Sequence, residues 1–499
     1  MRNYFIPAAF AAALLAGCNV LDKEPLTTIA PTNFFKTATD AESSITAAYD
    51  GLQRKGCYAE VLNLVGNMPS DDCTSANGDV RNLEVINWSS TTGQVYDAYR
   101  DPYVAINRAN AVIKYVPAIT NIVAARRDQI LGEARFIRAL CYFNLVRLYG
   151  PVPVRLEPTE TGDPAVLNLP RASATDVYNL IVDDLTKAAD LMADSNPSRA
   201  TKSSANALLA RVQLTQRNWT AAKDAANKVL TSSRYSLASS FNSLFPADNK
   251  AESVFEVQFS GSTDGGTFFS LPDIVMPTPP ATYSFQKFNI PTTRFPVVAG
   301  QPVLTGILQA ADTVNDLRWS AQGTISPGIN HASYVRGVSG GSNDRGPFVW
   351  KWRSNGNFFN SPDNYYVLRY AEMYLAYAEA SNELLGAPSQ DVLDKLNPIR
   401  QRAGLAALAL TSPQMASKAT MRAEIDLQRR LELAFEGERW FDLIRYARHE
   451  QADASARHTV SALDVIQQNR GSRDVNYLMF PIPLAELNTN TQLQQNPGY

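Results

Sequence analysis

The sequence has few of the residues that build metal centres. It contains four cysteines and three histidines in 499 residues, and none of them are grouped at the spacing of metal ligands. We therefore expect neither a metal site nor a cofactor. The scattered aspartates leave calcium binding undecided.

An excess of basic residues is also missing. The 46 lysines and arginines are balanced by 48 aspartates and glutamates. No basic stripe of the kind that contacts phosphate backbones is present, so we do not expect nucleic acid as a partner. After the first twenty residues, no apolar run approaches the roughly 20 residues that a membrane-spanning helix needs.

The longest apolar run stands at the start of the chain. Arg2 precedes residues 4–15, which are almost wholly apolar but too few to span a bilayer. The run leads into LLAGC at residues 14–18, which resembles the lipobox of a bacterial lipoprotein signal. The resemblance implies that residues 1–17 are a signal peptide and that Cys18 becomes an acylated first residue. Several acyl chains anchor a protein firmly, because each buried methylene contributes about 0.8 kcal/mol.

The residues after Cys18 bear on where such a lipoprotein ends up. Asn19 is not the aspartate that commonly retains lipoproteins in the inner membrane. Asp22 and Glu24 resemble the acidic export signals of surface lipoproteins in Bacteroidetes-type bacteria. We expect a lipid-anchored protein exposed on the cell outer membrane. The alternative is an ordinary secretory signal with an incidental cysteine.

Three cysteines remain once Cys18 is set aside. Cys57 and Cys73 lie close together in an irregular stretch, residues 56–94, and a disulfide between them would contribute about 3 kcal/mol in the chain-entropy model. Free thiols are an equal alternative. Cys141 falls within an apolar helical pattern, so we expect it to be a small core residue.

Helical periodicity dominates the first half of the chain. Apolar residues recur every three or four positions in four segments, 40–52, 95–116, 124–149 and 176–192. Asp40 is predicted to cap the first helix, and Gly150 followed by Pro151 to end the third. The third segment has two apolar stripes, which predicts burial on two sides.

A helical hairpin is predicted next, with alanine-rich arms at 205–214 and 221–230. It resembles a tetratricopeptide unit, whose helix pairs stack into a superhelix. Residues 252–259 alternate like a strand, and about 260–350 is rich in glycine, proline and polar residues, which indicates a long irregular insertion.

The second half returns to helices. We predict them at 368–385, 390–402 and 418–448, the last with a break near Gly437, followed by an extended tail at 477–499. The patterns together predict an all-α dominated fold of tetratricopeptide-like hairpins with a large loop-rich insertion and minor β structure. The expected divisions are the signal, an N-terminal part at 18–235 and a C-terminal part at 236–499.

Several motifs in order resemble the SusD/RagB family. EARFIRA at 133–139 and LYGPVP at 148–153 are similar to the family's central helix and its exit loop. The most recognisable block is RRLELAFEGERWFDLIR at 429–445. Further matches are LRYAEM at 368–373 with YAEA at 377–380, LNPIRQRAG at 396–404 and the ending QNPGY at 495–499. The likeness covers essentially the whole chain after Cys18.

The resemblance implies a function and partners. Family members are surface lipoproteins that bind nutrient oligomers, mostly glycans and sometimes peptides, without cleaving them. Each acts as a lid on a SusC-like, TonB-dependent outer-membrane transporter and delivers the ligand to it. The stacked helix pairs face the transporter, and loops on the other side hold the ligand.

Glu432 and Glu436 offer a rival interpretation, a surface glycoside hydrolase. They lie four residues apart on one helix face, and glycosidases use two carboxylates. A general acid needs a raised pKa, however, and the nearby Arg429, Arg430 and Arg439 favour ionised carboxylates. We therefore expect structural ion pairs and no enzyme. The same role is expected for five other charged residues in helix stacks, Glu133, Arg135, Arg138, Glu372 and Glu379.

Aromatic residues can serve either as sugar platforms or as packing. Tyr370, Tyr374 and Tyr377 stand at helical spacing, so packing is favoured for them. A glycan site requires an exposed ring beside short polar groups, and the resemblance places ligand contacts within residues 67–88 and 283–334. Our candidate ligand-binding residues from these two stretches are Asp71, Asp72, Arg81, Trp88, Tyr283 and Trp319.

Each candidate has a structural alternative. Trp88 and Trp319 would instead fill hydrophobic gaps, and Asp71 and Asp72 would cap a helix or brace a loop. A third hypothesis for the whole chain is a tetratricopeptide scaffold that joins other proteins and binds no nutrient. The sequence names no particular ligand.

Overall fold

Helices make up most of the chain that the structure describes. The computed structural model describes residues 34–75, 77–195, 198–245, 248–261, 269–275, 288–292, 304–325, 328–336, 347–352 and 361–499. The predicted all-α dominated class with minor β structure is confirmed. Within these ranges, no helix has both the length and the apolar character that crossing a bilayer requires.

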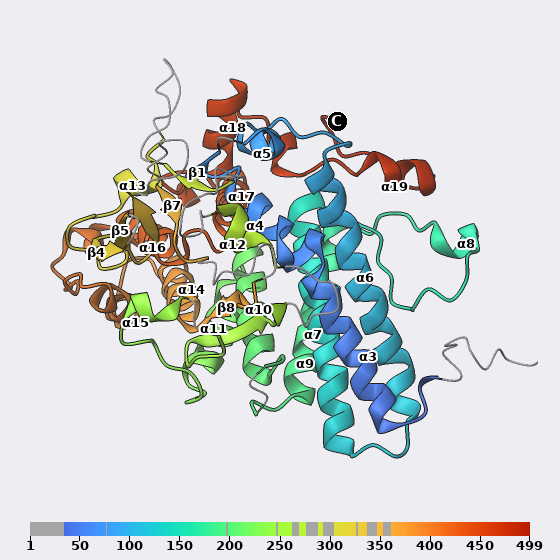
Figure 1. Cartoon of the computed structure of the whole chain (residues 1–499). Coiled ribbons are helices and arrows are strands. Elements are labelled where there is room, and N and C mark those ends of the chain that lie inside the picture. Colours follow the sequence, from blue (N-terminus) through green and yellow to red (C-terminus); the bar gives the residue numbers. More distant parts are fainter. Residues whose placement is uncertain are drawn as a thin grey trace, which may run out of the picture.

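The first half builds a bundle of long helices that lie side by side (Figure 1). They are α3 (Ala38–Asp50), α6 (Gly93–Tyr115), α7 (Ala124–Tyr149) and α9 (Ala174–Leu191). All four predicted segments are thereby confirmed. α7 packs against the other three helices. Every residue of α7 from Phe136 onward is buried, which explains why its sequence carries apolar stripes on two faces.

The start of α3 differs from the prediction. The capping residue is Thr37, whose hydroxyl accepts a hydrogen bond from the Asp40 backbone amide at 3.2 Å. The Asp40 carboxylate accepts in return from the Thr37 amide at 2.7 Å. Asp40 therefore belongs to a reciprocal capping box inside the first turn and is not the cap itself.

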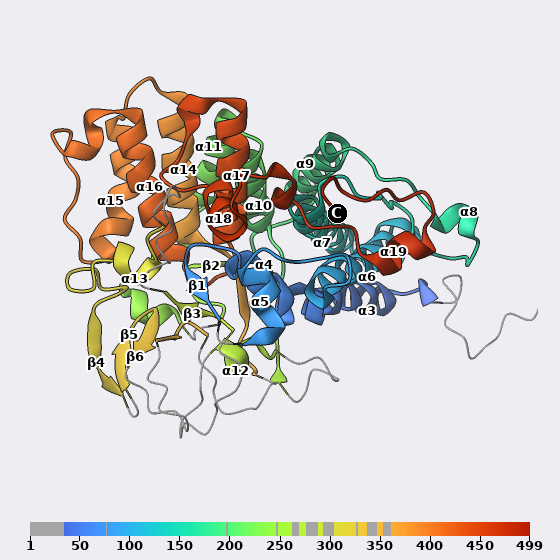
Figure 2. The same ribbon diagram turned by 90° about the horizontal axis from the view of Figure 1, so that it is seen from above.

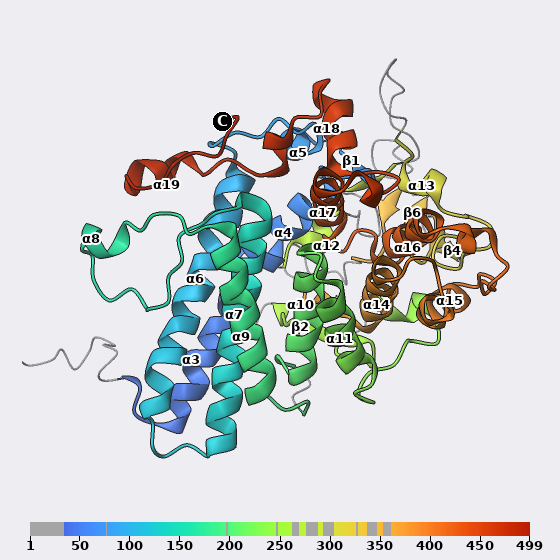
Figure 3. The same cartoon turned by 180° about the vertical axis from the view of Figure 1, so that it is seen from behind.

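Helical hairpins build the rest of the body. They are formed by α10 (Lys202–Thr215), α11 (Trp219–Leu230), α14 (Tyr370–Leu384), α15 (Gln390–Arg402), α16 (Lys418–Leu433) and α17 (Arg439–Ala452). α11 packs against α14, which lies about 140 residues further along, so hairpins from both halves stack together (Figure 3). The predicted break near Gly437 is confirmed, because Phe435 and Gly437 both have positive φ, 66° and 84°.

The predicted strand at 252–259 is confirmed as β2 (Ser253–Val257), which pairs antiparallel with β8 (Tyr365–Arg369). The insertion holds more regular structure than expected. A four-stranded antiparallel sheet runs through β4 (Ala321–Ile325), β5 (Gly328–His331), β6 (Tyr334–Arg336) and β7 (Phe348–Val349). A further short ladder joins β1 (Cys73–Thr74) to β3 (Ile290–Pro291).

Short helices occupy stretches that were expected to be irregular or extended. Those between 56 and 94 are α4 (Val61–Asn67) and α5 (Gly78–Glu84), and those in the insertion are α12 (Leu271–Val275) and α13 (Ile307–Ala310). α19 (Leu484–Thr489) lies inside the C-terminal tail, whereas α8 (Pro164–Leu167) and α18 (Ala462–Arg470) occupy stretches for which no element was predicted. Single turns stand at 51–53, 55–59, 116–118, 241–244, 413–416, 454–456 and 475–478.

The main hydrophobic core draws residues from Ala41 to Leu493. A second cluster lies between the hairpins α14, α15 and α16 and includes Leu375, Leu396 and Ile425.

All three described cysteines are buried free thiols. The free-thiol alternative therefore holds for Cys57 and Cys73, and Cys141 is the core residue that its helix predicted. The division at residue 235 stays a prediction.

Gly66 marks the closest approach between distant segments. A Cβ added to it would lie 1.9 Å from the carbonyl oxygen of Gly437, whereas one added to Gly78 meets nothing within 4 Å. Gly66→Ala is therefore expected to lower the free energy of unfolding by about 1–3 kcal/mol, as overpacking does. Urea denaturation measures this, with Gly78→Ala as the matched helical control. Equal stability of the two variants would contradict the close contact.

Candidate functional site

The two stretches predicted to hold ligand contacts lie side by side in the structure. β1 from the first pairs with β3 from the second, and the Thr292 amide extends the ladder by donating to the Asp72 carbonyl at 3.0 Å. β1, β3 and α5 lie on the same side as the β4–β7 sheet and opposite the stacked hairpins (Figure 2). We call the surface formed by α5, β1, β3 and the β4–β7 sheet the loop face.

Asp71 and Asp72 brace the base of the loop face. The Arg439 guanidinium donates to both oxygens of Asp71 at 2.8 and 3.0 Å, and Arg430 donates to Asp72 at 2.6 Å. Arg430 also donates to the carbonyls of Asp71 and Thr305 at 2.7 and 2.9 Å. All four side chains are buried. The loop-bracing alternative therefore describes the two aspartates.

The pKa values of the two carboxyl groups are shifted in opposite directions. Burial acts to raise both pKa values. For Asp71, the attraction of the Arg430 and Arg439 charges outweighs burial, so its pKa lies below its usual range. For Asp72, burial and repulsion from Asp71 outweigh the attraction of Arg430 and Arg439, so its pKa is raised. The Asp72 Oδ2 atom is also buried, and it has no hydrogen-bond partner among the residues that the structure describes.

Trp88 and Trp319 are both packed inside the protein, with relative exposures of 4% and 0%. Trp88 stacks edge-on against Phe480 and Trp440, and its Nε1 donates to the Tyr499 hydroxyl at 2.5 Å. Trp319 lies against Tyr334 and Phe435. Their placement as exposed sugar platforms is corrected, because both rings fill hydrophobic gaps and offer no face to a ligand in this conformation.

Arg81 has the exposure that a ligand contact requires. Its side chain is 62% exposed on α5, and its ion pair with Glu84 is long, at 3.8 Å. Asp79 and Asn82 are exposed on the same helix.

Tyr283 and Cys18 lie outside the described residues. In the described parts of both stretches, the aromatic rings of Trp88, Phe288, Trp319 and Tyr334 are all buried.

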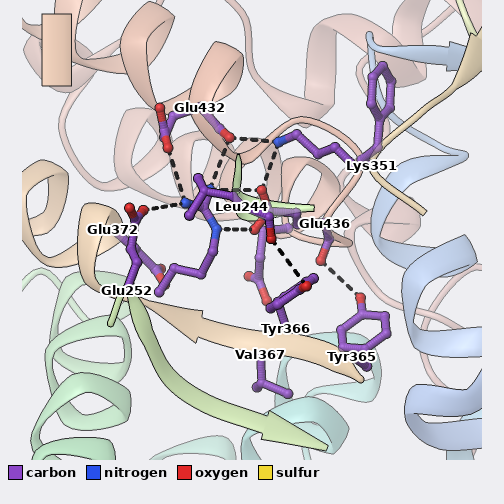
Figure 4. Close-up of polar contacts among 12 residues, drawn as sticks. Leu244, Glu252, Lys351, Tyr365, Tyr366, Val367, Glu372, Glu432 and Glu436 are labelled. Carbon is purple, nitrogen blue, oxygen red and sulfur yellow. Dashed lines mark hydrogen bonds and ion pairs between the residues drawn. The ribbon is translucent and has the colours of Figure 1, made fainter. Parts of the chain in front are cut away.

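Glu432 and Glu436 lie in a buried network of charges (Figure 4). Arg369 donates to Glu436 at 2.7 and 2.8 Å, to Glu432 at 3.1 Å and to Glu252 at 2.7 Å. Lys351 donates to a Glu436 carboxylate oxygen and to the Glu432 carbonyl, both at 2.7 Å. The expected ion pairing is confirmed.

The cations around this pair are not the ones that the sequence indicated. Glu432 pairs with Arg402 and Arg318 in addition to Arg369. Arg430 and Arg439 instead bind the aspartates of the loop face, and Arg429 binds Glu372 at 3.0 Å and Asp442 at 2.8 Å. Sequence spacing within one helix missed these partners, because each of them comes from a different element.

The electrostatics leave Glu432 ionised. Burial acts to raise its pKa, but Arg402, Arg369 and Arg318 outweigh it and hold the pKa far below the usual range. Burial also lowers the pKa of Lys351 to about 8. A carboxylate fixed by several cations has no proton to donate near neutral pH, so Glu432 does not meet the requirement for a general acid.

The other charged residues of the helix stacks are also paired. Arg135 and Arg138 donate to Asp184, Glu133 pairs with Arg126, and Glu379 with Arg445. The three tyrosines of α14 pack as predicted: the Tyr370 hydroxyl donates to the Leu230 carbonyl and the Tyr377 hydroxyl to Asp391, both at 2.9 Å. Tyr374 stacks edge-on against Tyr370.

Both ends of this architecture match models of one family. Residues 21–214 match a model described as "Starch-binding associating with outer membrane", and residues 304–499 match the model of the SusD family. The chain belongs to the SusD/RagB family. The family's helix-rich fold is the one described above.

Family relatives resemble the chain over its length. SusD-like protein P2 of Formosa agariphila is 26% identical over 519 residues, covering 100% of both chains. The starch-binding protein SusD of Bacteroides thetaiotaomicron is 25% identical over 503 residues, covering 89% of this chain and 86% of its own.

Solved structures of the SusD/RagB family share the fold. A SusD superfamily protein from Parabacteroides distasonis superposes with a TM-score of 0.73 at 25% identity, covering 92% of this chain and 99% of that one. A laminarin-binding SusD-like protein superposes with a TM-score of 0.71 at 24% identity, covering 93% and 100%.

Proposed function

We propose that this SusD/RagB protein is a surface lipoprotein that binds oligosaccharides and delivers them to a SusC-like, TonB-dependent outer-membrane transporter. The family supports the ligand class, because relatives named for starch and laminarin binding share its sequence or fold. The observation that carries the proposal is the convergence of residues 67–88 and 283–334 on one face. A peptide is the second candidate ligand.

The loop face is suited to holding a ligand because its base is rigid. The Asp71 and Asp72 ion pairs tie it to α16 and α17. Thr74 and Ser75 donate to Glu84 of α5 at 2.6 and 3.3 Å, which holds the helix that carries Arg81 next to this base. A preorganised element binds with less loss of entropy. We place the contact with the transporter on the stacked hairpins, which lie on the opposite side (Figure 2).

The buried charge network supports binding without cleavage. The paired carboxylates that resemble glycosidase chemistry are enclosed by cations and by packed side chains. A dialysed sample incubated with candidate glycans is expected to yield no product on chromatography. The appearance of shortened oligosaccharides would favour the hydrolase hypothesis.

Removal of the lipid attachment residue is expected to release the protein from the membrane. Cys18→Ser removes the thiol that would carry the diacylglyceryl group, so the protein should move from the membrane pellet to the soluble fraction and lose label from radioactive palmitate. Asn19→Ala, one residue further on, is the matched control and should stay in the pellet. Retention of Cys18→Ser in the pellet would contradict lipid anchoring.

Arg81 is proposed as a direct ligand contact on the loop face. We expect Arg81→Ala to weaken oligosaccharide binding by about 1.5–3 kcal/mol, the scale of a hydrogen bond from a charged donor, which is roughly tenfold to a hundredfold in Kd. Isothermal titration against a polysaccharide panel measures this. Arg127→Ala, an arginine paired with Asp128 at the start of α7, is the control. A panel that gives no heat with any member would favour the scaffold hypothesis.

A further inference from the structure

A cleft with a volume of about 310 Å³ lies between α6, the segment 153–168 and α19. These elements stand at the opposite end of the molecule from the β4–β7 sheet of the loop face (Figure 1). The lining side chains that matter are Tyr99, Arg100, Tyr103, Asn107, Arg155 and Glu486. The volume is at the lower end of the roughly 300–1,000 Å³ that small-ligand sites occupy.

The walls of the cleft are held in place by hydrogen bonds between its three elements. The Tyr103 hydroxyl donates to the Pro153 carbonyl at 2.8 Å, and the Thr159 amide donates to the Asn107 side chain at 2.7 Å. On the other side, the Asn490 amide group donates to the Leu169 carbonyl at 2.8 Å. The cleft is therefore formed without a ligand, which lowers the entropic cost of binding.

Glu486 is the group that the fold does not account for. Its half-buried carboxylate makes no hydrogen bond or ion pair with any residue that the structure describes, although it lines the cleft. Burial raises its pKa, and Arg155 and Arg100 act in the opposite direction. Arg155 donates one Nη2 hydrogen to the Leu167 carbonyl, and Arg100 pairs with Asp97 and Asp101. A partly desolvated carboxylate of this kind gains from a hydrogen-bond donor in the cleft.

The chemistry of the lining selects the ligand class. Glu486 would repel an anion and the two arginines would repel a cation, so a neutral ligand fits. The carboxylate accepts from hydroxyl groups, while the guanidinium and amide groups donate to them. The half-buried ring of Tyr103, which lines the cleft, supplies an aromatic surface for a C–H face. We infer that this cleft is a second saccharide site, which takes a mono- or disaccharide unit independently of the loop face.

Saturation-transfer NMR on the full chain tests the inference, with maltose, cellobiose and sucrose as probes. At least one disaccharide should give a signal with the wild-type protein. Thr489→Trp places a ring over the cleft from an exposed position that lines it, and should reduce the signal at least fivefold. Asn488→Trp is the matched control, since the adjacent exposed residue does not line the cleft and should leave the signal unchanged.

Two further variants separate this site from other sources of signal. Glu486→Ala should also lose the signal. This variant tests the site even when the indole of Thr489→Trp turns away from the cleft. Arg81→Ala on the loop face should keep the signal, so that a failure of this site and a failure of the proposed function are distinguishable. The absence of a wild-type signal would overturn the inference. So would equal signals from Thr489→Trp, Glu486→Ala and the wild type, or a dependence on Arg81.

Discussion

Replacing Arg369 by methionine is expected to lower the free energy of unfolding by about 3–5 kcal/mol. Arg369 is the one cation that contacts three buried carboxylates, those of Glu252, Glu432 and Glu436, among the residues that the structure describes. Methionine matches the arginine side chain in length as far as Nε but carries no charge. The substitution would leave the carboxylates of a buried network short of a partner, and an uncompensated buried charge is strongly destabilising.

Urea denaturation followed by tryptophan fluorescence measures the effect. Lys187→Met is the matched control, because Lys187 pairs with Asp183 at 2.7 Å on the surface and both side chains are about half exposed, at 52% and 50%. A surface pair of this kind contributes about 0–1 kcal/mol. A loss of stability at Arg369 no larger than at Lys187 would show that the buried network does not hold the two halves together.

Acid is expected to unfold the protein through the same kind of carboxylate. The pKa values of Glu432, Glu372, Asp442 and Asp71 all lie below their ordinary values of 4.5 for glutamate and 3.8 for aspartate, because attraction to buried arginines outweighs burial. The unfolded chain therefore binds protons at a higher pH than the folded one. Stability is fully present above about pH 5 and is lost as the pH falls.

The slope of this loss is large. Between its ordinary pKa and its lowered one, each such group removes up to about 1.4 kcal/mol per pH unit, so the loss of stability steepens as the pH falls from 4.5 to 3. Asp72 acts in the opposite direction because its pKa is raised. Urea titrations at pH 6, 5, 4 and 3 measure the loss.

Variants assign the acid sensitivity to the buried network. Glu432→Gln cannot take up the extra proton, so its stability should depend on pH less steeply than that of the wild type, by about one proton. Glu160→Gln removes a carboxylate that is 41% exposed and pairs with Lys114 at 3.1 Å, so it should leave the slope unchanged. A Glu432→Gln slope equal to the wild-type slope would place the titrating groups elsewhere.

Local patterns in the sequence were enough to predict most helices. The long helix α7 carries its own signals, since apolar residues recur at helical spacing and Gly150 ends it with a φ of 70°. Two- to five-residue strands in the insertion escaped prediction, because sheets such as β4–β7 form through pairing between segments and not through long runs of alternation. The capping of α3 was misassigned by one turn because Thr37 and Asp40 are both good capping residues.

The loop face, the proposed site of ligand contacts, was expected as a region and not residue by residue. Motif resemblance identified both stretches, but a tryptophan next to asparagines looks the same in the sequence whether it is exposed or packed. Trp88 is covered by Phe480 and Tyr499, which are about 400 residues away, and no local signal shows this. The bracing role of Asp71 and Asp72 could not be predicted for the same reason, since their arginine partners come from the C-terminal block.

The ties between the loop face and the C-terminal helices also govern the order in which the protein assembles. Asp71 and Arg439 are 368 residues apart, and Asp72 and Arg430 are 358 apart. Contacts between such distant segments close late, because loop-closure entropy must be overcome before they form. The base of the loop face is therefore completed only after residue 439 has been synthesised. Until then Asp71 and Asp72 lack their arginine partners.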